Sequence, residues 1–260
     1  MCYTVTVEDY EQILAAWREK KITGDALLAE ALNGQGVSFA YHSCRIENPQ
    51  VTFHDTREIF DHDGVTGYTG DLKTLFEIRN AKAAYECFLD AFGFRRPIDE
   101  TFIKELHFLL TQNTYDTRRW QLGERPGEYK KHDYVIGKHD IGAAPEDVAE
   151  EMSELLAELQ DVKDKDILTS AAYFHAKFEN IHAFADGNGR VGRLAMNYFL
   201  VLHNHPPVTI HEEDRREYFG ALEAWDEKQA LTPLTEFLLG QTIKTWQKNI
   251  PAKNKDKKKS

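Results

Sequence analysis

The chain has 260 residues, of which 42% are hydrophobic, and its formal net charge is −11. This apolar content can build a sizeable core, which excludes wholesale disorder, and the length suits one large domain or one domain with a small appendage. The acidic balance argues against a general nucleic-acid-binding surface, because lysine and arginine must neutralise phosphates. The charge is uneven: residues 248–260 hold six lysines against one aspartate, a local +5 that leaves −16 on residues 1–247.

Helical periodicity dominates the chain and predicts an all-α fold. Residues 7–20, for example, carry Tyr10, Ile13, Leu14 and Trp17 at helical spacing. The expected helices span residues 7–20, 24–32, 38–47, 56–62, 71–92, 99–110, 145–159, 168–180, 190–204, 214–228 and 234–248. The sequence around residues 33–36 (NGQG) reads as a break between the second and third helices.

Three stretches interrupt the helical pattern. The glycine-rich residues 63–70 are the best internal boundary, and they separate an N-terminal helical extension (1–70) from a larger core (71–248). Residues 123–142 contain two short glycine-bounded runs, which predict a small β-hairpin. The lysine-rich residues 249–260 predict a disordered tail.

The cysteine spacing and the lack of long apolar runs indicate the cellular compartment of the protein. Three cysteines without a CxxC spacing argue against a disulfide framework and favour a reducing cytoplasm. No stretch approaches the ~18 uninterrupted apolar residues that a membrane span needs, and the first residues show no signal-peptide pattern. We therefore expect a cytoplasmic protein without a membrane partner.

One segment, residues 181–193 (IHAFADGNGRVGR), carries the residues that suggest chemistry, and it lies between two apolar helices. Gly187, Asn188 and Gly189 lead into the second of these helices. The first turn of a helix presents N–H donors without intrahelical partners and a positive potential. The segment therefore predicts an anion site, above all for phosphate.

Charged side chains surround this predicted anion site. Arg190 and Arg193 are three apart in the first turn, so they share a face and can both reach the anion. Asp186 can hold Mg²⁺, which prefers a carboxylate together with phosphate oxygens. His182 can act as a general base near neutral pH. This set of residues predicts phosphate-transfer chemistry.

Each of these residues also has an ordinary structural interpretation. A lone histidine before a loop is usually structural, an Asp-Gly-Asn-Gly run is usually a turn, and two arginines three apart usually form a solvated face. Their joint occurrence in one short window favours the functional interpretation. Residues 187–192 also match GxGxxG, but residues 171–180 before them are helical and no βαβ alternation exists, which excludes a dinucleotide fold.

The same window, residues 182–193 (HAFADGNGRVGR), closely resembles the signature of the Fic family, HxFx[DE]GNGRxxR. The resemblance covers roughly residues 71–248. It implies an all-α Fic core with a β-hairpin flap beside the active site, and transfer of AMP from ATP to a Ser, Thr or Tyr hydroxyl of a protein. The related Doc toxins, which phosphorylate, carry ANKR-like residues where this chain has residues 187–190, so the match favours nucleotidyl transfer.

The resemblance implies a role for each motif residue. His182 would deprotonate the target hydroxyl, and Asp186 would hold Mg²⁺. The residues that would bind the nucleotide phosphates are Gly187, Asn188, Gly189, Arg190 and Arg193, the last of which would meet the γ-phosphate. ATP as substrate and Mg²⁺ as cofactor follow from this resemblance.

Residues 127–137 resemble the flap of the family. Here Tyr134, Val135 and Ile136 would dock the target by strand addition, a mode of recognition that ignores most side chains. Lys130 takes the place of the arginine found in the family's flap.

Residues 215–226 (RREYFGALEAWD) resemble the helix that forms the adenine pocket of the family. Tyr218 and Leu222 would line the base. Asp226 stands where many members have asparagine, which puts the adenine contacts at this position in question.

Upstream of the core, residues 43–48 (SCRIEN) resemble the family's inhibitory motif, [ST]xxxE[GN]. Ser43 and Glu47 are four apart, so they share one face of a helix. The resemblance implies that Glu47 pairs with Arg193 and keeps ATP from binding productively, because a carboxylate then occupies the arginine that the γ-phosphate needs. The structural alternative is an ordinary helix C-terminus capped by Asn48.

The leading hypothesis is therefore a self-inhibited, Mg²⁺-dependent protein adenylyltransferase. Two alternatives stay open: removal of AMP from a modified protein at the same site, and a non-catalytic adaptor that binds nucleotide. The expected partner is a protein substrate, with the chain itself as a further acceptor. Nucleic acid and membranes are not expected as partners, and a homo-oligomer stays open.

Overall fold

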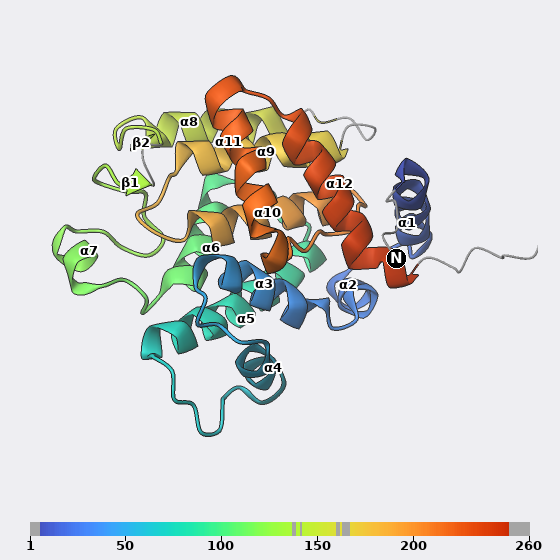
Figure 1. Ribbon diagram of the computed structural model, residues 1–260, viewed down its shortest axis with the longest axis horizontal. Coiled ribbons are helices and arrows are strands. Elements are labelled where there is room, and N and C mark those ends of the chain that lie inside the picture. Colours follow the sequence, from blue (N-terminus) through green and yellow to red (C-terminus); the bar gives the residue numbers. More distant parts are fainter. Residues whose placement is uncertain (1–5, 137–138, 141, 160–161, 163–166, 250–260) are drawn as a thin grey trace, which may run out of the picture.

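The computed structural model describes residues 6–136, 139–140, 142–159, 162 and 167–249. The chain folds as a bundle of helices, which confirms the predicted all-α class (Figure 1). The helices are α1 (Val7–Glu19), α2 (Asp25–Leu32), α3 (Gln35–Glu47), α4 (Phe53–His62), α5 (Leu72–Gly93), α6 (Glu100–Thr111), α7 (Thr117–Gln121), α8 (Val148–Glu158), α9 (Ile167–Ile181), α10 (Asn188–Leu202), α11 (Arg215–Lys228) and α12 (Thr232–Trp246). Short 3₁₀ turns follow at Glu212–Asp214 and Gln247–Asn249.

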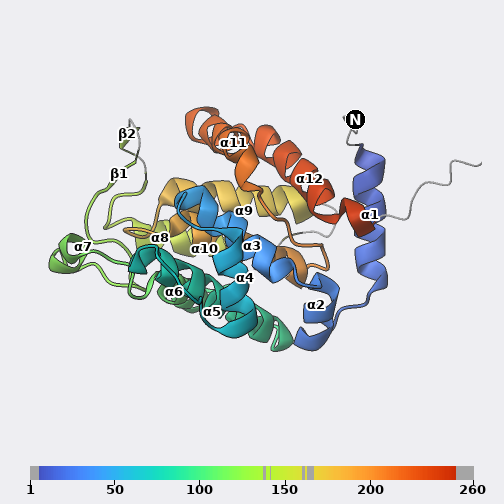
Figure 2. The same cartoon turned by 60° about the horizontal axis from the view of Figure 1, so that its bottom comes forward.

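Helix α10 lies in the middle of the bundle, and α3, α5, α6 and α9 pack around it (Figures 1 and 2). Its side chains are buried on nearly every face, both the apolar ones, such as Tyr198, and the polar ones, such as Arg193. A helix with such surroundings cannot move without disturbing its neighbours, because protein interiors are close-packed. The N-terminus of α10 is therefore a fixed point of the fold.

Helix α3 begins earlier than the sequence predicts. The break between α2 and α3 is made by Asn33 and Gly34, which have left-handed φ angles of 38° and 79°. Gly36, expected to belong to the break, lies inside the helix. A Cβ atom there would lie 2.5 Å from the ring of Tyr85 in α5, so the glycine permits a close approach of the two helices instead of ending one.

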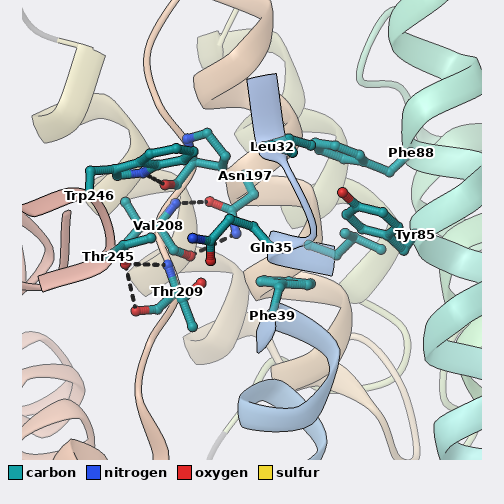
Figure 3. A pocket seen from close by; sticks show the side chains of 12 residues that line it. Leu32, Gln35, Phe39, Tyr85, Phe88, Asn197, Val208, Thr209, Thr245 and Trp246 are labelled. Atoms are coloured by element: carbon teal, nitrogen blue, oxygen red, sulfur yellow. Dashed lines mark hydrogen bonds between the residues drawn. The ribbon is translucent and has the colours of Figure 1, made fainter. Parts of the chain in front are cut away.

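A small cavity lies beneath the N-terminal half of α3 (Figure 3). Gln35 and Phe39 of α3 line it together with Tyr85 and Phe88 of α5 and with Val208, which follows α10. Its volume is about 20 Å³, close to the smallest space that can hold one water molecule. This end of α3 thus rests on an apolar contact that is slightly underfilled.

The described strands are β1 (Val135–Ile136) and β2 (His139–Asp140), which pair antiparallel with Val135 opposite Asp140 and Ile136 opposite His139. The pair lies near α7 at one end of the molecule, and α1 lies at the other end (Figures 1 and 2). Helix α7 was not expected from the sequence. It has only five residues, too few to show a helical period, although Asp116 caps it through the backbone N–H of Arg119.

One hydrophobic core extends from Tyr10 in α1 to Trp246 in α12. The boundary predicted at residues 63–70 falls on the non-helical link between α4 and α5. The helices before this link, α2 to α4, pack on α5, so the extension and the Fic-like core share one interior. Of the tail predicted at 249–260, all but Asn249 lies outside the described residues.

Within the described ranges, no helix is both long enough and apolar enough to cross a membrane.

Candidate active site

The chemistry-bearing loop, residues 182–187, connects the end of α9 to the start of α10. Asn188 fastens it: its side-chain oxygen accepts from the Phe184 N–H at 2.9 Å, and its amide nitrogen donates to the Phe184 carbonyl at 2.8 Å. The ring of Phe184 is fully buried. The Asn188 side chain is therefore occupied in holding the loop, which leaves its backbone N–H for a ligand.

The first turn of α10 has backbone N–H groups that could bind an anion. Gly187 is its N-cap, with a left-handed φ of 88°, and it provides no side chain to cap the helix. A Cβ there would lie 2.6 Å from a methyl carbon of Thr111, so the loop can pass this point only with glycine. The N–H groups of Asn188, Gly189 and Arg190 have no acceptor within the helix, because the first helical residues never do.

His182, the predicted base, sits at the start of this loop with a left-handed φ of 51°. Burial, together with the nearby Lys130 ammonium, lowers the pKa of its imidazole to about 4. The ring is therefore neutral at pH 7, which is the form that can accept a proton.

Asp186, the predicted metal carboxylate, lies between two arginines. Its carboxylate is 3.2 Å from Arg190 Nη2 and 3.7 Å from Arg119 Nη2. Burial opposes ionisation of this group, but Arg190 and Arg119 outweigh that effect, so the pKa of Asp186 lies below its ordinary value. The side chain is therefore an anion at neutral pH.

The donor set around Asp186 suits a metal that arrives with its ligand. The described residues contain no cluster of three or more His, Cys, Asp or Glu side chains that could hold a metal alone. Mg²⁺ does not need one, because it keeps several waters and takes one or two carboxylates together with substrate phosphate oxygens. A single ionised carboxylate beside an anion site fits this requirement.

Arg190 is 4% exposed and lies between two carboxylates. Asp186 is one of them, and Glu77 of α5 is the other, with Oε1 at 3.7 Å from Arg190 Nη1. Two nitrogens of the guanidinium, Nε and Nη1, have no hydrogen-bond partner among the described residues. Buried donors without partners are costly, and a phosphate would satisfy them.

Arg193, the second motif arginine, is 1% exposed, and its guanidinium is bound by residues of α3. Its Nε donates to Ser43 Oγ at 3.0 Å, and its Nη2 donates to the Ser43 carbonyl and to Glu47 Oε1, each at 2.8 Å. A Cβ on Gly189 would collide with Glu47 Oε1, so the carboxylate lies directly over the first turn of α10. The structure thus brings Ser43, Glu47 and Arg193 together, as the sequence predicts.

The three residues expected in the adenine pocket differ from one another in burial and in their partners. Tyr218 is fully buried; its hydroxyl lies 2.7 Å from His175 Nε2 and accepts from Arg193 Nη1 at 3.5 Å. Leu222 is 8% exposed on the same helix. Asp226 lies at the surface, where it accepts from Asn180 Nδ2 at 2.9 Å. Tyr218 therefore supports Arg193 from below.

Asp226 lines a surface groove of about 310 Å³ that also includes Asn180, Tyr173 and Trp225. Asn180 comes two residues before His182 in the sequence. The groove therefore lies beside the end of α9, and Asp226 presents a carboxylate to it.

The flap begins beside the loop and is attached to it. The Lys130 N–H donates to the Ala183 carbonyl at 2.9 Å, and beyond the flap the Ala143 N–H donates to the Ile181 carbonyl at 2.9 Å. Tyr134, one of the predicted docking residues, donates its hydroxyl proton to the buried Glu124 at 2.9 Å. Of Val135 and Ile136 the structure describes the paired backbone; their side chains lie outside the described part.

Three residues of the site were missed by the sequence reasoning. His107 of α6 contacts both the loop and the flap, Arg119 of α7 contacts Asp186, and Glu77 of α5 contacts Arg190. Each lies at least 60 residues along the chain from its partner in the loop or in α10. A lone charged or imidazole side chain on an amphipathic helix carries no local signal, because its partner is set by the packing of the helices.

Sequence comparison shows which known proteins the chain resembles. Residues 97–200 match the model of the Fic/DOC family. A protein adenylyltransferase Fic from Culex quinquefasciatus is 28% identical over 227 residues, which cover 85% of this chain and 43% of that protein. One from Nematostella vectensis is 30% identical over 189 residues, or 70% of this chain and 41% of that protein. The chain thus spans about two fifths of the length of these relatives.

Solved structures show the same fold. A Fic domain containing signaling protein from Bacteroides thetaiotaomicron superposes with a TM-score of 0.78 at 24% identity, covering 93% of this chain and 95% of that one. Fic-1 from C. elegans (residues 134–508) superposes with a TM-score of 0.76 at 21% identity, covering 94% of this chain and 71% of that one.

Proposed function

The chain is a Fic domain protein, and on that premise we propose that it transfers AMP from ATP to a Ser, Thr or Tyr hydroxyl of a protein. The observation that carries this proposal is the first turn of α10, which has no side-chain cap among the described residues, with the neutral His182 before it and the Arg190 nitrogens that lack hydrogen-bond partners there beside it. This arrangement offers an anion site and a base within one loop. A nucleoside triphosphate and a hydroxyl nucleophile are the substrates that such a pair serves.

In the proposed reaction the target hydroxyl attacks the α-phosphorus of ATP. The new bond joins the hydroxyl oxygen to phosphorus, the bond from the α-phosphorus to the bridging oxygen breaks, and pyrophosphate leaves. His182 accepts the hydroxyl proton, which its neutral imidazole can do at pH 7. The N–H groups of Asn188 and Gly189 and the side chain of Arg190 hold the phosphates. Mg²⁺ held by Asp186 would neutralise part of the phosphate charge.

The position of the target follows from the flap. The Lys130–Ala183 hydrogen bond places the start of the flap beside the residue that follows His182. A target segment paired with the β1 edge would lie across the entrance to the loop. Pairing through the backbone selects few side chains, so the target hydroxyl would be chosen by its place on an extended segment.

We further propose that α3 inhibits the reaction. Glu47 and Ser43 occupy three of the hydrogen bonds that the Arg193 guanidinium can donate. The γ-phosphate of ATP would need the same donors, so ATP would bind in an unproductive position while Glu47 is in place. The buried Arg193 cannot turn elsewhere, because Tyr218 closes the remaining side.

The test is incorporation of label from [α-³²P]ATP with Mg²⁺ in a cell lysate. We compare the wild-type chain with Glu47→Gly, and use [γ-³²P]ATP in a parallel reaction. Label from the α-position only, appearing on proteins or on the chain itself with Glu47→Gly, supports AMP transfer. Label from the γ-position would indicate phosphorylation instead, and no label with intact ATP binding would favour a non-catalytic nucleotide-binding adaptor.

One observation favours a second activity at the same site. The Glu47 side chain stays 36% exposed, although its Oε1 contacts Arg193. A carboxylate so placed can orient a water molecule toward a phosphoryl group, as removal of AMP from a modified protein requires. An AMP-modified target that loses its label with the wild-type chain and keeps it with Glu47→Gly would establish this second activity.

A further inference from the structure

His107 is a fully buried residue of α6 to which neither the proposed reaction nor the sequence motif assigns a role. It lies where three segments meet: α6 itself, the loop of residues 182–187, and the start of the flap at Gly127. Both of its ring nitrogens are engaged, and its partners belong to the two segments that the proposed reaction must bring together.

The hydrogen bonds of His107 fix its tautomer. Nδ1 accepts from the backbone N–H of Gly127 at 2.8 Å, so this nitrogen carries no proton. Nε2 therefore carries the ring proton and donates it to the carbonyl oxygen of Asp186 at 2.9 Å. The hydroxyl oxygens of Tyr115 and Thr111 lie farther away, at 3.4 and 3.5 Å from Nε2.

The ring of His107 also supports the loop from below. It stacks on Phe184, with centroids 3.8 Å apart and planes inclined by 7°. A Cβ on Gly187 would come within 3.6 Å of the same ring. His107 thus contacts the loop at Phe184, at Asp186 and at Gly187, which are the residues that precede the first turn of α10.

We propose that His107 is a positioning residue that sets the Asp186 backbone and the entry to the flap relative to each other. This inference rests on the proposed function, in which Asp186 holds Mg²⁺ and the flap docks the protein target. Through Nε2 it orients the peptide that bears the carboxylate, and through Nδ1 it holds Gly127, whose left-handed φ of 84° turns the chain toward the flap. Only the neutral ring can do both, since a doubly protonated ring cannot accept from Gly127.

Three substitutions separate the two hydrogen bonds, each made in the Glu47→Gly background. His107→Phe keeps the stacking on Phe184 and removes both bonds. His107→Gln places an amide near the position of Nε2 and can still donate to Asp186. His107→Asn places one near Nδ1 and can still accept from Gly127. The matched control is His205→Phe, because His205 is equally buried but bonds to Tyr10 and Pro206, beyond the end of α10 that is opposite the loop.

We expect His107→Phe to lower kcat/KM for AMP transfer and the affinity for Mg²⁺-ATP by roughly 10- to 100-fold, the usual cost of losing a group that orients a metal ligand. His107→Gln should recover the Mg²⁺-ATP affinity, and His107→Asn should recover the KM for the protein target. A loss with His107→Phe no larger than that with His205→Phe, or recovery of both quantities by either amide, would overturn the proposal.

Two measurements do not depend on AMP transfer. Calorimetry reports Mg²⁺-ATP affinity directly, and amide hydrogen exchange reports the Gly127 N–H, which should exchange faster in His107→Phe and His107→Gln than in His107→Asn. If Glu47→Gly transfers no AMP, the proposed function fails, and these two measurements still decide the role of His107. Unchanged exchange at Gly127 in a folded His107→Gln variant would contradict it.

Discussion

The two ends of α3 contact the rest of the molecule in different ways. At the C-terminal end, Ser43 and Glu47 accept hydrogen bonds from Arg193. At the N-terminal end, Gln35 and Phe39 line a small cavity (Figure 3). Gly36 lies against Tyr85. One end is held by directional contacts to a charge, and the other by apolar packing that is not quite complete.

The difference indicates how inhibition and stability can be separated. A phosphate can replace a carboxylate at a guanidinium, because both offer the same acceptors. It cannot replace apolar packing. The backbone at the C-terminal end is also fixed, since Arg215 Nε donates to the Ile46 carbonyl at 2.7 Å and Asn48 Nδ2 donates to Glu77 at 2.7 Å. We therefore expect removal of the Glu47 carboxylate to free Arg193 for the γ-phosphate of ATP while α3 stays in place.

The largest effect should come from Glu47 itself. Glu47→Gly removes the carboxylate from Arg193, and we expect the rate of AMP incorporation to rise by at least about 10-fold, the equivalent of one hydrogen bond to a charged group. Glu47→Gln is the matched variant, since it keeps the size and loses the charge; it should give a smaller rise. A thermal unfolding midpoint within ~2 °C of wild type for both would show that α3 is still packed, and a collapse of that midpoint would contradict the separation.

A smaller rise is expected from Ser43→Ala. This change removes the oxygen that accepts from Arg193 Nε at 3.0 Å, while the Ser43 carbonyl and Glu47 keep their bonds. The loss of one neutral acceptor corresponds to roughly a two- to tenfold rise in incorporation. Ser38→Ala, on a half-buried position of the same helix, is the control and should not change the rate. Equal rates for Ser43→Ala and Glu47→Gly would contradict the idea that the charge of Glu47 contributes most of the inhibition.

The apolar end should affect stability more than activity. Gly36→Ala places a methyl group against the Tyr85 ring, and overpacking of this kind costs about 1–3 kcal/mol in the free energy of unfolding. Chemical denaturation measures this loss. The rate of AMP incorporation should change by less than about twofold, because Gly36 does not contact Arg193 and distant sites act nearly independently. Gly34→Ala is a poor control because its φ is 79°, so Gly24→Ala, which meets no neighbour, serves instead.

The smallest effect should come from mild acid. Burial, with Lys130 adding to it, lowers the pKa of His182 to about 4, so the base form persists as the pH falls through the range in which an ordinary histidine protonates. Activity of Glu47→Gly should therefore fall by less than about twofold between pH 7 and pH 5.5, where a histidine of ordinary pKa would lose about 10-fold. An acid limb centred near pH 6.5 would show that His182 is not buried in the working enzyme.

The sequence predicts the parts of this site that are local. His182, Asp186 and the two arginines lie within one loop and one helical turn, so their spacing alone places them on a common anion site. Ser43 and Glu47 were found through the family resemblance, since no local rule connects α3 to Arg193. Eleven of the twelve described helices and most of their boundaries follow from periodicity, which is strong in long amphipathic segments.

The parts that the sequence does not predict depend on tertiary contacts. His107 has the appearance of any buried histidine until α6 is packed under the loop. Asn188 was expected to bind a nucleotide phosphate, and the use of its side chain in holding Phe184 is visible only in the folded loop. Gly36 resembles a helix breaker in the sequence, but the approach of Tyr85 makes it a packing position.

The central claim is that α3 holds Arg193 away from a site in which His182 transfers AMP. The measurement that tests it most directly is incorporation of α-labelled ATP by the wild-type chain, Glu47→Gly, and the double variant Glu47→Gly with His182→Ala. The account predicts a low signal, a high signal and no signal, in that order, with similar ATP binding by the last two. A double variant that still incorporates label, or a Glu47→Gly variant no more active than wild type, would contradict it.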